Sequence, residues 1–492
     1  MNNIPFICII LSMAGAIVLL LLGKRSEAAL RLTQGILLVV AVLSAVLVSY
    51  FAKSGGSITY MLGHYPAPWG NELRFGLFES VLALVFSIVL FLALLGGEND
   101  FVEDIQSRKR SQYFALISLL LLSLLALIYT NDIFTAYVFI EINTIASCGI
   151  VMVKESGETL RATIKYLFMS LMASGLFLIS IAIMYSITGH LLIPNLAESV
   201  QNLVATGEYH WPLLIACSLM TVSLGIKSAM FPFHTWLPDA HGTATTSSSS
   251  ILSGVVVKGY IILLIKLYYR VFTIDVVKDL GVLNVVFCLG LAGMVGGSLF
   301  AIREKNLKRM IAYSSVAQIG YIYAGIGIGT YAGLAAALFH MIVHAFTKPL
   351  LFSSAGGLIG VSNHSKLIKD MNGAGRRNVM AGIGFLVGSL SMVGFPLFGG
   401  FTSKIFLAET ANGTGYAFLV ALALSSFLNA LYYLPVLFRI FSRSPEGINE
   451  QEGSKTDFSY ALSIGVFSIV NILLGTGGIY LLHLLNQGVQ IL

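Results

Sequence analysis

The chain has 492 residues, of which 57% are hydrophobic and only 11% are charged, and its mean hydropathy is +0.86. Because a soluble domain carries about 25% charged residues, this composition excludes a soluble protein and indicates an integral membrane protein. The formal net charge is +6. The distribution of these charges follows membrane topology, so the net charge implies no nucleic-acid partner.

Apolar segments of about 20 residues, long enough to cross hydrocarbon as helices, recur along the whole chain. The first has no Lys or Arg before it and no small-residue cleavage site after it, so we interpret it as a retained helix and not a signal peptide. We predict fourteen transmembrane helices, at residues 4–23, 30–52, 73–96, 112–130, 133–152, 163–187, 210–235, 249–270, 281–302, 310–329, 331–353, 379–410, 417–439 and 458–486.

Basic residues are divided unevenly between alternate loops. Five Lys and Arg residues fall on the side of the N-terminus: Lys53, Arg74, Lys266, Arg270 and Lys278. Twenty fall in or beside the loops of the other side, which lie near 24–31, 97–111, 153–165, 303–309, 354–378 and 440–457. Cytoplasmic loops carry the excess of basic residues. We therefore expect a multi-pass protein of the cell inner membrane with both termini on the outer side.

Four lysines remain, and all of them fall inside predicted spans: Lys227, Lys258, Lys348 and Lys404. The four cysteines, Cys8, Cys148, Cys217 and Cys288, lie far apart in apolar segments. With no CxxC spacing, we expect neither a metal nor an iron–sulfur centre, and no other cofactor, in this chain.

The middle of the chain divides into two groups of five helices. An odd number of crossings makes the second group start from the opposite face, so the two groups would form inverted repeats. The fourth member of each group pairs a lysine with a proline, Lys227 with Pro232 and Lys404 with Pro396, as the discontinuous helices of transport sites do.

These patterns predict an all-α membrane protein of four parts. They are residues 1–111, with helices one to three and an outer hairpin or extended loop at 53–72; residues 112–275, the first repeat; residues 276–440, the second repeat; and residues 441–492, a cytoplasmic loop and the last helix.

Ionisable residues inside a membrane are costly, since a charge at the centre of a helix costs about 2.5 to 3.5 kcal/mol on insertion scales. Glu141 lies in mid-span, with Thr144 and Cys148 on the same helical face. It is either a protonated carboxyl group bonded to a neighbouring helix or a proton-binding carboxylate tuned by a nearby lysine, and the functional interpretation is favoured. Lys258 follows Ser247, Ser250 and Gly254 on one face. The serines pack helices together and leave room for water around a lysine that carries protons.

His340, His344 and Lys348 recur every four residues, so they share one helical stripe. Pro349 removes a backbone hydrogen bond next to the lysine. Each of these side chains can bind and release a proton, and moving one charge changes the proton affinity of the next. A zinc site is the competing interpretation of the two histidines, but the stripe has no acidic third ligand and places a cation beside them.

Glu79 and Glu409, near the ends of their segments, are weaker candidates that either belong to the site or simply lie at an interface. Trp69, Trp211 and Trp236 fall near predicted helix ends, where an aromatic belt is a sufficient explanation. His234 and His241 lie near a predicted cytoplasmic end, where they are caps or mark an entrance.

The sequence resembles the antiporter-like membrane subunits shared by respiratory complex I (NADH:quinone oxidoreductase), Mrp-type sodium/proton antiporters and membrane-bound hydrogenases. The stretches that carry the resemblance are "NDIFTAYVFIE" at 131–141, "FPFHTWLPDAH" at 231–241, "NLKRMIAYSSVAQIG" at 306–320 and "FHMIVHAFTKPLLF" at 339–352.

The resemblance implies roles for individual residues. Glu141 and Lys227 correspond to the ion pair that modulates proton affinity, and Lys258 corresponds to the lysine of the eighth helix. His340, His344 and Lys348 correspond to the hydrophilic axis between two half-channels, and Lys404 corresponds to the residue that faces the exit. His234 and His241 belong to the signature stretch.

Within that family, a lysine at 404 and the stretch "LGHYPAPWGNELRFGLFE" resemble the D-type Mrp subunit and its hydrogenase counterpart, although Glu79 stands where an aspartate is more usual. We therefore expect a proton-translocating subunit of a multisubunit ion-pumping complex, of the Mrp or hydrogenase type, with other membrane subunits as partners and protons or sodium as ions. A complex I subunit, a stand-alone secondary transporter and a purely structural membrane anchor are the alternatives.

Overall fold

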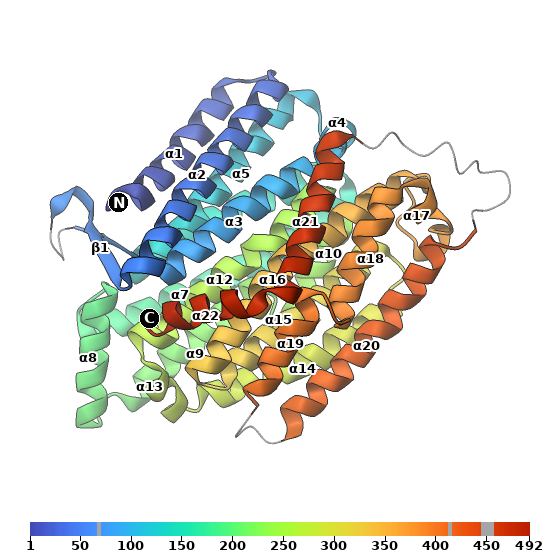
Figure 1. Cartoon of the computed structure of the whole chain (residues 1–492). Coiled ribbons are helices and arrows are strands. Elements are labelled where there is room, and N and C mark those ends of the chain that lie inside the picture. The colour runs from blue at the N-terminus through green and yellow to red at the C-terminus, as the bar shows by residue number, and fades with distance from the viewer. Residues whose placement is uncertain (66–69, 412–415, 444–456) are drawn as a thin grey trace.

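The computed structural model describes residues 1–65, 70–411, 416–443 and 457–492. In these ranges the protein is a bundle of helices with one small two-stranded sheet at its edge (Figure 1). The expected all-α membrane architecture is confirmed: twelve helices are long and apolar enough to span a membrane. Trp69 and Lys455 lie outside the described residues.

The N-terminal part consists of a helical hairpin, the sheet and a third long helix. The strands pair antiparallel with Ser57 opposite Gly76, so the loop expected at 53–72 belongs to a hairpin whose second strand, Glu72–Gly76, extends beyond that range. The elements are α1 (Ile4–Leu21), α2 (Ser26–Ser54), β1 (Ser57–Met61), η1 (Leu62–His64), β2 (Glu72–Gly76), α3 (Leu77–Leu95) and α4 (Glu98–Asp104).

The next part contains the first five predicted spans after α3. Asp132 and Ser156 cap two of its helices by accepting hydrogen bonds from the backbone N–H groups of Thr135 and Thr159. The elements are α5 (Ser107–Tyr129), α6 (Ile133–Met152), α7 (Gly157–Thr188), α8 (Ile193–Thr206), α9 (His210–Lys227), η2 (His234–Trp236), α10 (Leu237–Thr243), α11 (Thr246–Ile251), the π-helical turn η3 (Leu252–Val256), α12 (Val257–Lys266) and the π-helical turn η4 (Leu267–Val271).

The remaining part contains the other predicted spans. Asn306, Thr330 and Asn378 cap three of its helices in the same way. The elements are α13 (Ile274–Asp279), α14 (Val282–Arg303), α15 (Leu307–Gly327), α16 (Tyr331–Gly360), η5 (Ile368–Asp370), α17 (Ala374–Arg377), α18 (Val379–Val393), α19 (Gly399–Glu409), α20 (Tyr416–Ile440), α21 (Phe458–Thr476) and α22 (Gly478–Val489).

Three predicted spans are divided in the structure. The span at 210–235 ends as a helix at Lys227, the span at 379–410 is split into α18 and α19, and the span at 458–486 is split into α21 and α22. The first two breaks contain Pro232 and Pro396, which cannot donate a helical hydrogen bond. Discontinuous helices therefore occur where we expected them, while the inverted symmetry of the two groups and the boundaries of the four parts stay predictions.

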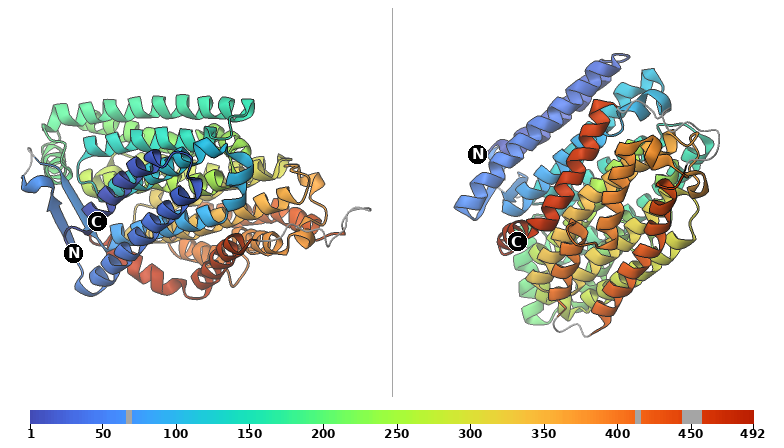
Figure 2. Two further views of the ribbon diagram at one scale, coloured as in Figure 1. Left: turned by 90° about the horizontal axis from the view of Figure 1, so that it is seen from above. Right: turned by 45° about the vertical axis from the view of Figure 1, so that its right-hand side comes forward.

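The helices are arranged around two that are enclosed by the others. The segment Thr246–Val271 and the central part of α16 are fully buried, whereas α1, α2, α7, α14, α20 and α21 expose much of their surface. A helix that is apolar all round and enclosed by others forms a core, and any polar side chain on it must find partners inside the protein. Figures 1 and 2 show α1 and α2 at one edge of the bundle and α14 and α20 near the opposite edge.

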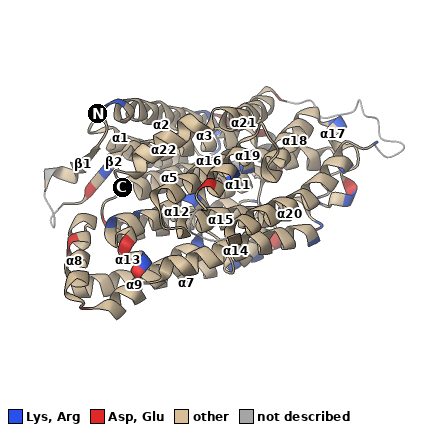
Figure 3. Ribbon diagram, turned by 60° about the horizontal axis from the view of Figure 1, so that its bottom comes forward, with Lys and Arg blue, Asp and Glu red and all other residues tan. Residues whose placement is uncertain are grey.

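The loops gather at two opposite ends of the bundle. At one end, Lys154 pairs with Asp104, Lys165 and Arg309 pair with Asp239, and Lys366 donates to the carbonyl of Gly242. We call this end, made by the loops near 24–31, 97–111, 153–165, 303–309, 354–378 and 440–443, the basic face. Both termini, the sheet, α8 and α13 lie at the other end (Figures 1 and 2). Charges are sparse along the ribbons between them (Figure 3).

Candidate functional site

The first buried ion pair joins α6 and α9. The Nζ atom of Lys227 lies 3.8 Å from the Oε1 atom of Glu141 and donates a hydrogen bond of 2.8 Å to the Oγ1 atom of Thr144. The hydroxyl group of Ser174 on α7 donates to the same carboxylate of Glu141. The Lys227 side chain is fully buried and that of Glu141 is 25% exposed. Two charges of opposite sign are thus held within proton-exchange reach through small hydroxyl side chains.

Lys227 is the last residue of α9, so its ammonium group lies at a helix break. Within that break Ala229 has a φ of 58°, a left-handed conformation that costs a non-glycine residue roughly 1–3 kcal/mol. The ring of Tyr260 on α12 lies 5.7 Å from the Lys227 Nζ atom. This contact links the first ion pair to the enclosed helix that carries Lys258.

Lys404 lies at the second break in a related way. Its Nζ atom donates to the carbonyl oxygens of Met392 at 2.8 Å and Val393 at 2.9 Å, the last two residues of α18. A cation is stabilised at the carbonyl end of a helix. Leu397, in this break, is also left-handed, with a φ of 89°. Lys227 precedes its proline in the sequence and Lys404 follows its proline, yet the ammonium group of each lies beside a helix break.

The stripe of α16 is buried along its whole length. His340, His344 and Lys348 are each 0% exposed. The Nδ1 atom of His340 is 2.9 Å from the hydroxyl of Ser403, and its ring stacks on Tyr321 with centroids 5.1 Å apart. The Nζ atom of Lys404 lies 5.6 Å from the same Tyr321 ring. His340 therefore connects the stripe to Lys404.

Lys348 has polar partners on two neighbouring helices. Its Nζ atom donates to the carbonyl of Ile311 at 3.0 Å, to the hydroxyl of Ser314, and to the hydroxyl of Tyr433 at 3.4 Å. Both ring nitrogens of His344 are buried without a hydrogen-bond partner among the described residues. Buried polar groups normally have hydrogen-bond partners. His344 is therefore the residue of the stripe whose polar atoms are least satisfied by the described protein.

Lys258 follows a π-helical turn, a feature that is common at functional sites. Its ammonium group donates to the carbonyl of Ser253 in that turn. A Cβ atom on Gly254 would lie 2.8 Å from the ring of Pro349 and 3.5 Å from the carbonyl of Ala345. The glycine thus lets the turn approach α16 between His344 and Lys348, which brings the helix of Lys258 against the stripe.

The two signature histidines are buried but are not joined to the lysines by hydrogen bonds among the described residues. The ring of His234 packs among Phe231, Phe300 and Tyr313 at centroid distances of 5.2 to 6.2 Å. His241 stacks on Phe352 at 4.7 Å. Neither of its nitrogens has a described partner.

A charged cavity of about 510 Å³ opens on the basic face next to His241. Asp239 divides its carboxylate between Lys165 at 2.7 Å and Arg309 at 2.5 Å. Gly242 and Thr243, directly after His241, belong to the lining. Nearby, burial and then the charge of Lys154 lower the pKa of the Lys366 ammonium group. The cavity is therefore a polar opening on the basic face, lined by the residues that follow the buried His241.

The sequence counted Lys266 and Arg270 among the basic residues of the outer side, at the end of the predicted span 249–270, and the structure shows that both side chains are buried inside the protein. They lie in the enclosed segment Thr246–Val271 and are 0% and 6% exposed. Lys266 donates to the carbonyls of Leu127, Ile128 and Thr130 at the end of α5. Arg270 forms an ion pair with Glu79. Both charges thus have polar partners inside the protein, as buried charges require.

The structure also bears on the expectations for the tryptophans and for Glu409. Trp236 is 1% exposed and stacks on Tyr166 at 4.1 Å, so the aromatic-belt explanation is wrong for it, whereas Trp211 is 70% exposed. Glu409 is exposed at the end of α19. Among the described residues there is no cluster of three His, Cys, Asp or Glu residues that could hold a metal ion.

Sequence reasoning missed the uncharged partners of these sites. Ser174 bonds to Glu141, and Ser314 bonds to Lys348. The hydroxyl group of Tyr432 donates to the Asn429 side chain at 2.5 Å. The Asn429 amide in turn donates at 3.1 Å to the carbonyl of Met392, which also accepts from Lys404. Serine, asparagine and tyrosine are common in membrane helices as packing residues. Their spacing alone therefore carried no signal for a role at the site.

Comparison with known proteins gives one family match. Residues 130–429 match the family described as NADH:quinone oxidoreductase/Mrp antiporter, transmembrane region. This range includes Glu141, Lys227, Lys258, the α16 stripe and Lys404.

Individual relatives match over most of their length. The D-type subunit of the Na(+)/H(+) antiporter of Bacillus subtilis (strain 168) is 27% identical, over 100% of this chain and 97% of its own length. The N-type subunit of the NADH-quinone oxidoreductase of Desulforudis audaxviator (strain MP104C) is 29% identical, over 88% of this chain and 86% of its own length.

Two solved structures share the fold. A chain from the archaeal membrane-bound sulfane sulfur reductase, a respiratory membrane complex, superposes with a TM-score of 0.89 at 24% identity and covers 99% of this chain and 97% of its own. A chain of the Mrp complex from Dietzia sp. DQ12-45-1b gives a TM-score of 0.87 at 22% identity, with the same coverage of both chains. At this identity the two likenesses establish the fold.

Proposed function

Because this chain belongs to the NADH:quinone oxidoreductase/Mrp antiporter membrane-subunit family, we propose that it translocates protons as one subunit of a larger ion-pumping membrane complex. The observation that carries the proposal is the pair of Glu141 and Lys227, held 3.8 Å apart inside the membrane part of the bundle. Intramembrane ionisable residues mark ion pathways and proton relays. No other feature of the fold accounts for a lysine at the end of a broken apolar helix.

In this proposal protons pass along the buried ionisable residues. Glu141 and Lys227 form a switchable pair, Lys258 and the stripe of His340, His344 and Lys348 form the central relay, and Lys404 holds the far end. The charged cavity at Asp239 supports an entrance on the basic face, next to His241. The contacts from His340 through Tyr321 to Lys404 support a connection between the stripe and the far end of the route. The chain supplies transport and needs no cofactor of its own.

Other membrane subunits are required by the position of Glu141. Its carboxylate is 25% exposed on a surface where Phe134, Ile145 and Phe168 are 45% to 67% exposed. A charge facing lipid is costly, so we infer that a neighbouring subunit covers this surface. The matches to subunits of antiporters and of respiratory complexes support such an assembly.

Among the possible complexes we favour an Mrp-type cation/proton antiporter or a membrane-bound hydrogenase over complex I. The lysine at position 404 supports this choice, together with the match to the Bacillus subtilis antiporter subunit, which is 27% identical over the whole chain. In the same proposal the protein lies in the cell inner membrane with its basic face in the cytoplasm and its termini outside.

The test replaces Lys227 or Glu141 by Ala in the assembled complex and measures the formation of a pH gradient in membrane vesicles. We expect a loss of roughly 100-fold, the order of a general acid–base contribution, because either change leaves its partner without a charge to respond to. Lys227→Arg, which keeps the positive charge but holds its proton, should be as inactive as Lys227→Ala.

Lys24→Ala is the matched control, since Lys24 is an exposed lysine in a loop. It should pump normally, and the amounts of assembled complex should be equal for all variants. Undiminished pumping by both Lys227→Ala and Glu141→Ala would refute the proposal.

A further inference from the structure

A second cavity on the basic face opens beside the membrane-facing helices α14 and α20. Its volume is about 640 Å³, within the range of ligand sites. Its walls come from the end of α14, the connection to α15, the segment 367–369 and the last part of α20. None of the residues in the proposed proton route, from Glu141 to Lys404, lines it.

Three basic side chains stand around this cavity: Lys305, Lys369 and Arg439. Within the described ranges none of them forms a salt bridge. The acidic residue of the lining, Glu304, is engaged elsewhere: its carboxylate binds Arg309 at 3.0 Å and accepts from the backbone N–H groups of Lys305 and Asn306. The cavity therefore offers an uncompensated positive charge.

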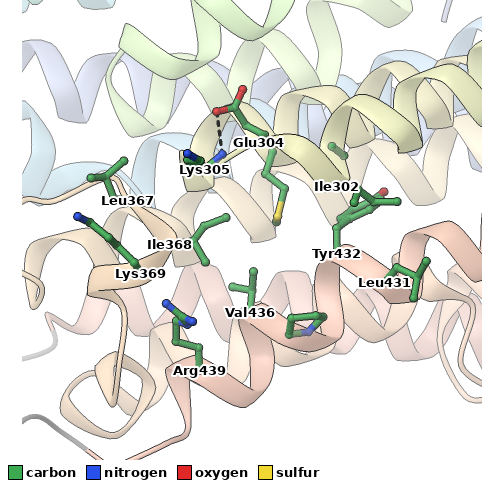
Figure 4. A pocket seen from close by; sticks show the side chains of 13 residues that line it. Ile302, Glu304, Lys305, Leu367, Ile368, Lys369, Leu431, Tyr432, Val436 and Arg439 are labelled. Atoms are coloured by element: carbon green, nitrogen blue, oxygen red, sulfur yellow. Dashed lines mark hydrogen bonds between the residues drawn. The ribbon is translucent and has the colours of Figure 1, made fainter.

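Three apolar residues of the lining face outward. Ile302, Leu367 and Leu431 are 39%, 39% and 46% exposed, although each is a large hydrophobic side chain. Figure 4 shows Lys369 and Arg439 at one end of the cavity and Ile302, Leu431 and Tyr432 at the other. Leu431 lies eight residues before Arg439 on α20, which corresponds to about 12 Å along the helix. The cavity is thus polar toward the loops and apolar toward the middle of the membrane.

We propose that this cavity binds one anionic glycerophospholipid. Its phosphate group lies among Lys305, Lys369 and Arg439, and an acyl chain follows the wall made by Ile302 and Leu431. Basic pockets between transmembrane helices bind anionic lipid headgroups in this manner. The order of the two ends matches a lipid that stands in the bilayer, with its headgroup at the interface.

The apolar end argues for a lipid and against a free anion. Inorganic phosphate would use the three cations and leave the exposed wall of Ile302 and Leu431 uncovered. An acyl chain lies along this wall, so a lipid uses both ends of the cavity. The site also has a connection inward, because the lining residue Tyr432 is joined through Asn429 to the Met392 carbonyl that binds Lys404.

The test uses the whole complex, exchanged into detergent with increasing phosphatidylglycerol or with phosphatidylcholine. Bound lipid is counted by native mass spectrometry. We expect one tightly held phosphatidylglycerol and no equivalent phosphatidylcholine. In the triple variant Lys305→Gln, Lys369→Gln and Arg439→Gln, its affinity should fall roughly 100-fold, since one basic residue near an anionic lipid surface contributes about fivefold.

The control variant carries Lys24→Gln, Arg25→Gln and Arg108→Gln, the same charge change in basic-face loops away from the cavity. It should retain the lipid. A photoreactive residue in place of Leu431 identifies the occupant in native membranes, and it should capture lipid. Crosslinking of Leu431 to another protein subunit, displacement of the lipid by millimolar inorganic phosphate, or equal lipid binding by the two triple variants would each overturn the proposal. These readouts do not depend on pumping, so they stay separate from the test of proton transport.

Discussion

Arg270 is a buried cation whose charge is balanced, within the described residues, by the carboxylate of Glu79 alone. Removing one partner of such a pair leaves an uncompensated buried charge, which costs about 3 to 5 kcal/mol. Replacing both partners by apolar residues of similar volume is often neutral or stabilising. Glu79→Gln should therefore be strongly destabilising, while Glu79→Gln combined with Arg270→Met should recover most of the loss.

The measurement is the thermal midpoint of the purified complex in detergent, followed by size-exclusion chromatography after heating. The exposed pair of Lys109 and Glu155 provides the comparison: Glu155→Gln should change the free energy of unfolding by less than about 1 kcal/mol. If Glu79→Gln were as mild as Glu155→Gln, the buried pair would have no role in holding α3 against the enclosed segment.

The same residues show what sequence could and could not provide. Lys227, Lys258 and Lys348 could be found because a charge in an apolar run stands out locally. The partner of Arg270 could not be identified from the sequence. Glu79 is 191 residues away in the chain, and its charge lies near a predicted helix end. Lys227 and Thr144 are 83 residues apart. Such contacts depend on helix packing, which hydropathy does not encode.

The breaks after α9 and after α18 are built from the same two features. Each contains a proline and one non-glycine residue in the left-handed region, Ala229 or Leu397. Local sequence predicted the breaks, because proline lacks the N–H group that a continuing helix needs. It did not predict that Lys404 would reach back to the end of α18, since the direction of a side chain across a break depends on the fold of the break.

Pro396→Ala tests the purpose of the second break. In a continuous helix the N–H group of residue 396 would bond to the carbonyl of Met392, which now accepts from Lys404. Alanine restores this donor and competes with the lysine for one hydrogen bond of about 1 kcal/mol. Proton transport should fall about fivefold, measured in vesicles as the rate of pH-gradient formation.

Pro194 gives the matched control, because it lies in the first turn of α8, where the missing N–H group has no helical partner anyway. Pro194→Ala should transport at the normal rate. Equal rates for Pro194→Ala and Pro396→Ala would show that the carbonyl end of α18 need not stay open for Lys404.

For the whole molecule, hydropathy was sufficient to predict a membrane bundle, because the need for about 20 apolar residues per crossing is local. It also found a helix whose polar side chains are satisfied inside, since the predicted span 310–329 corresponds to α15. The helix α15 has 21 residues but is not among the twelve most apolar spans, and its serines bind Lys348 and Ser253 instead of facing lipid.

The basic face unites loops from most of the chain, and the positive-inside rule predicts that it lies in the cytoplasm. We predict that Arg108→Cys reacts with a membrane-impermeant maleimide only after the cells are opened, whereas Lys53→Cys, at the opposite end of the bundle, reacts in intact cells. Both positions are exposed. The background should carry Cys288→Ser, since Cys288 is exposed while Cys8, Cys148 and Cys217 are buried. The reverse labelling pattern would place the Asp239 cavity, and with it the proposed proton entrance, on the outer side of the membrane.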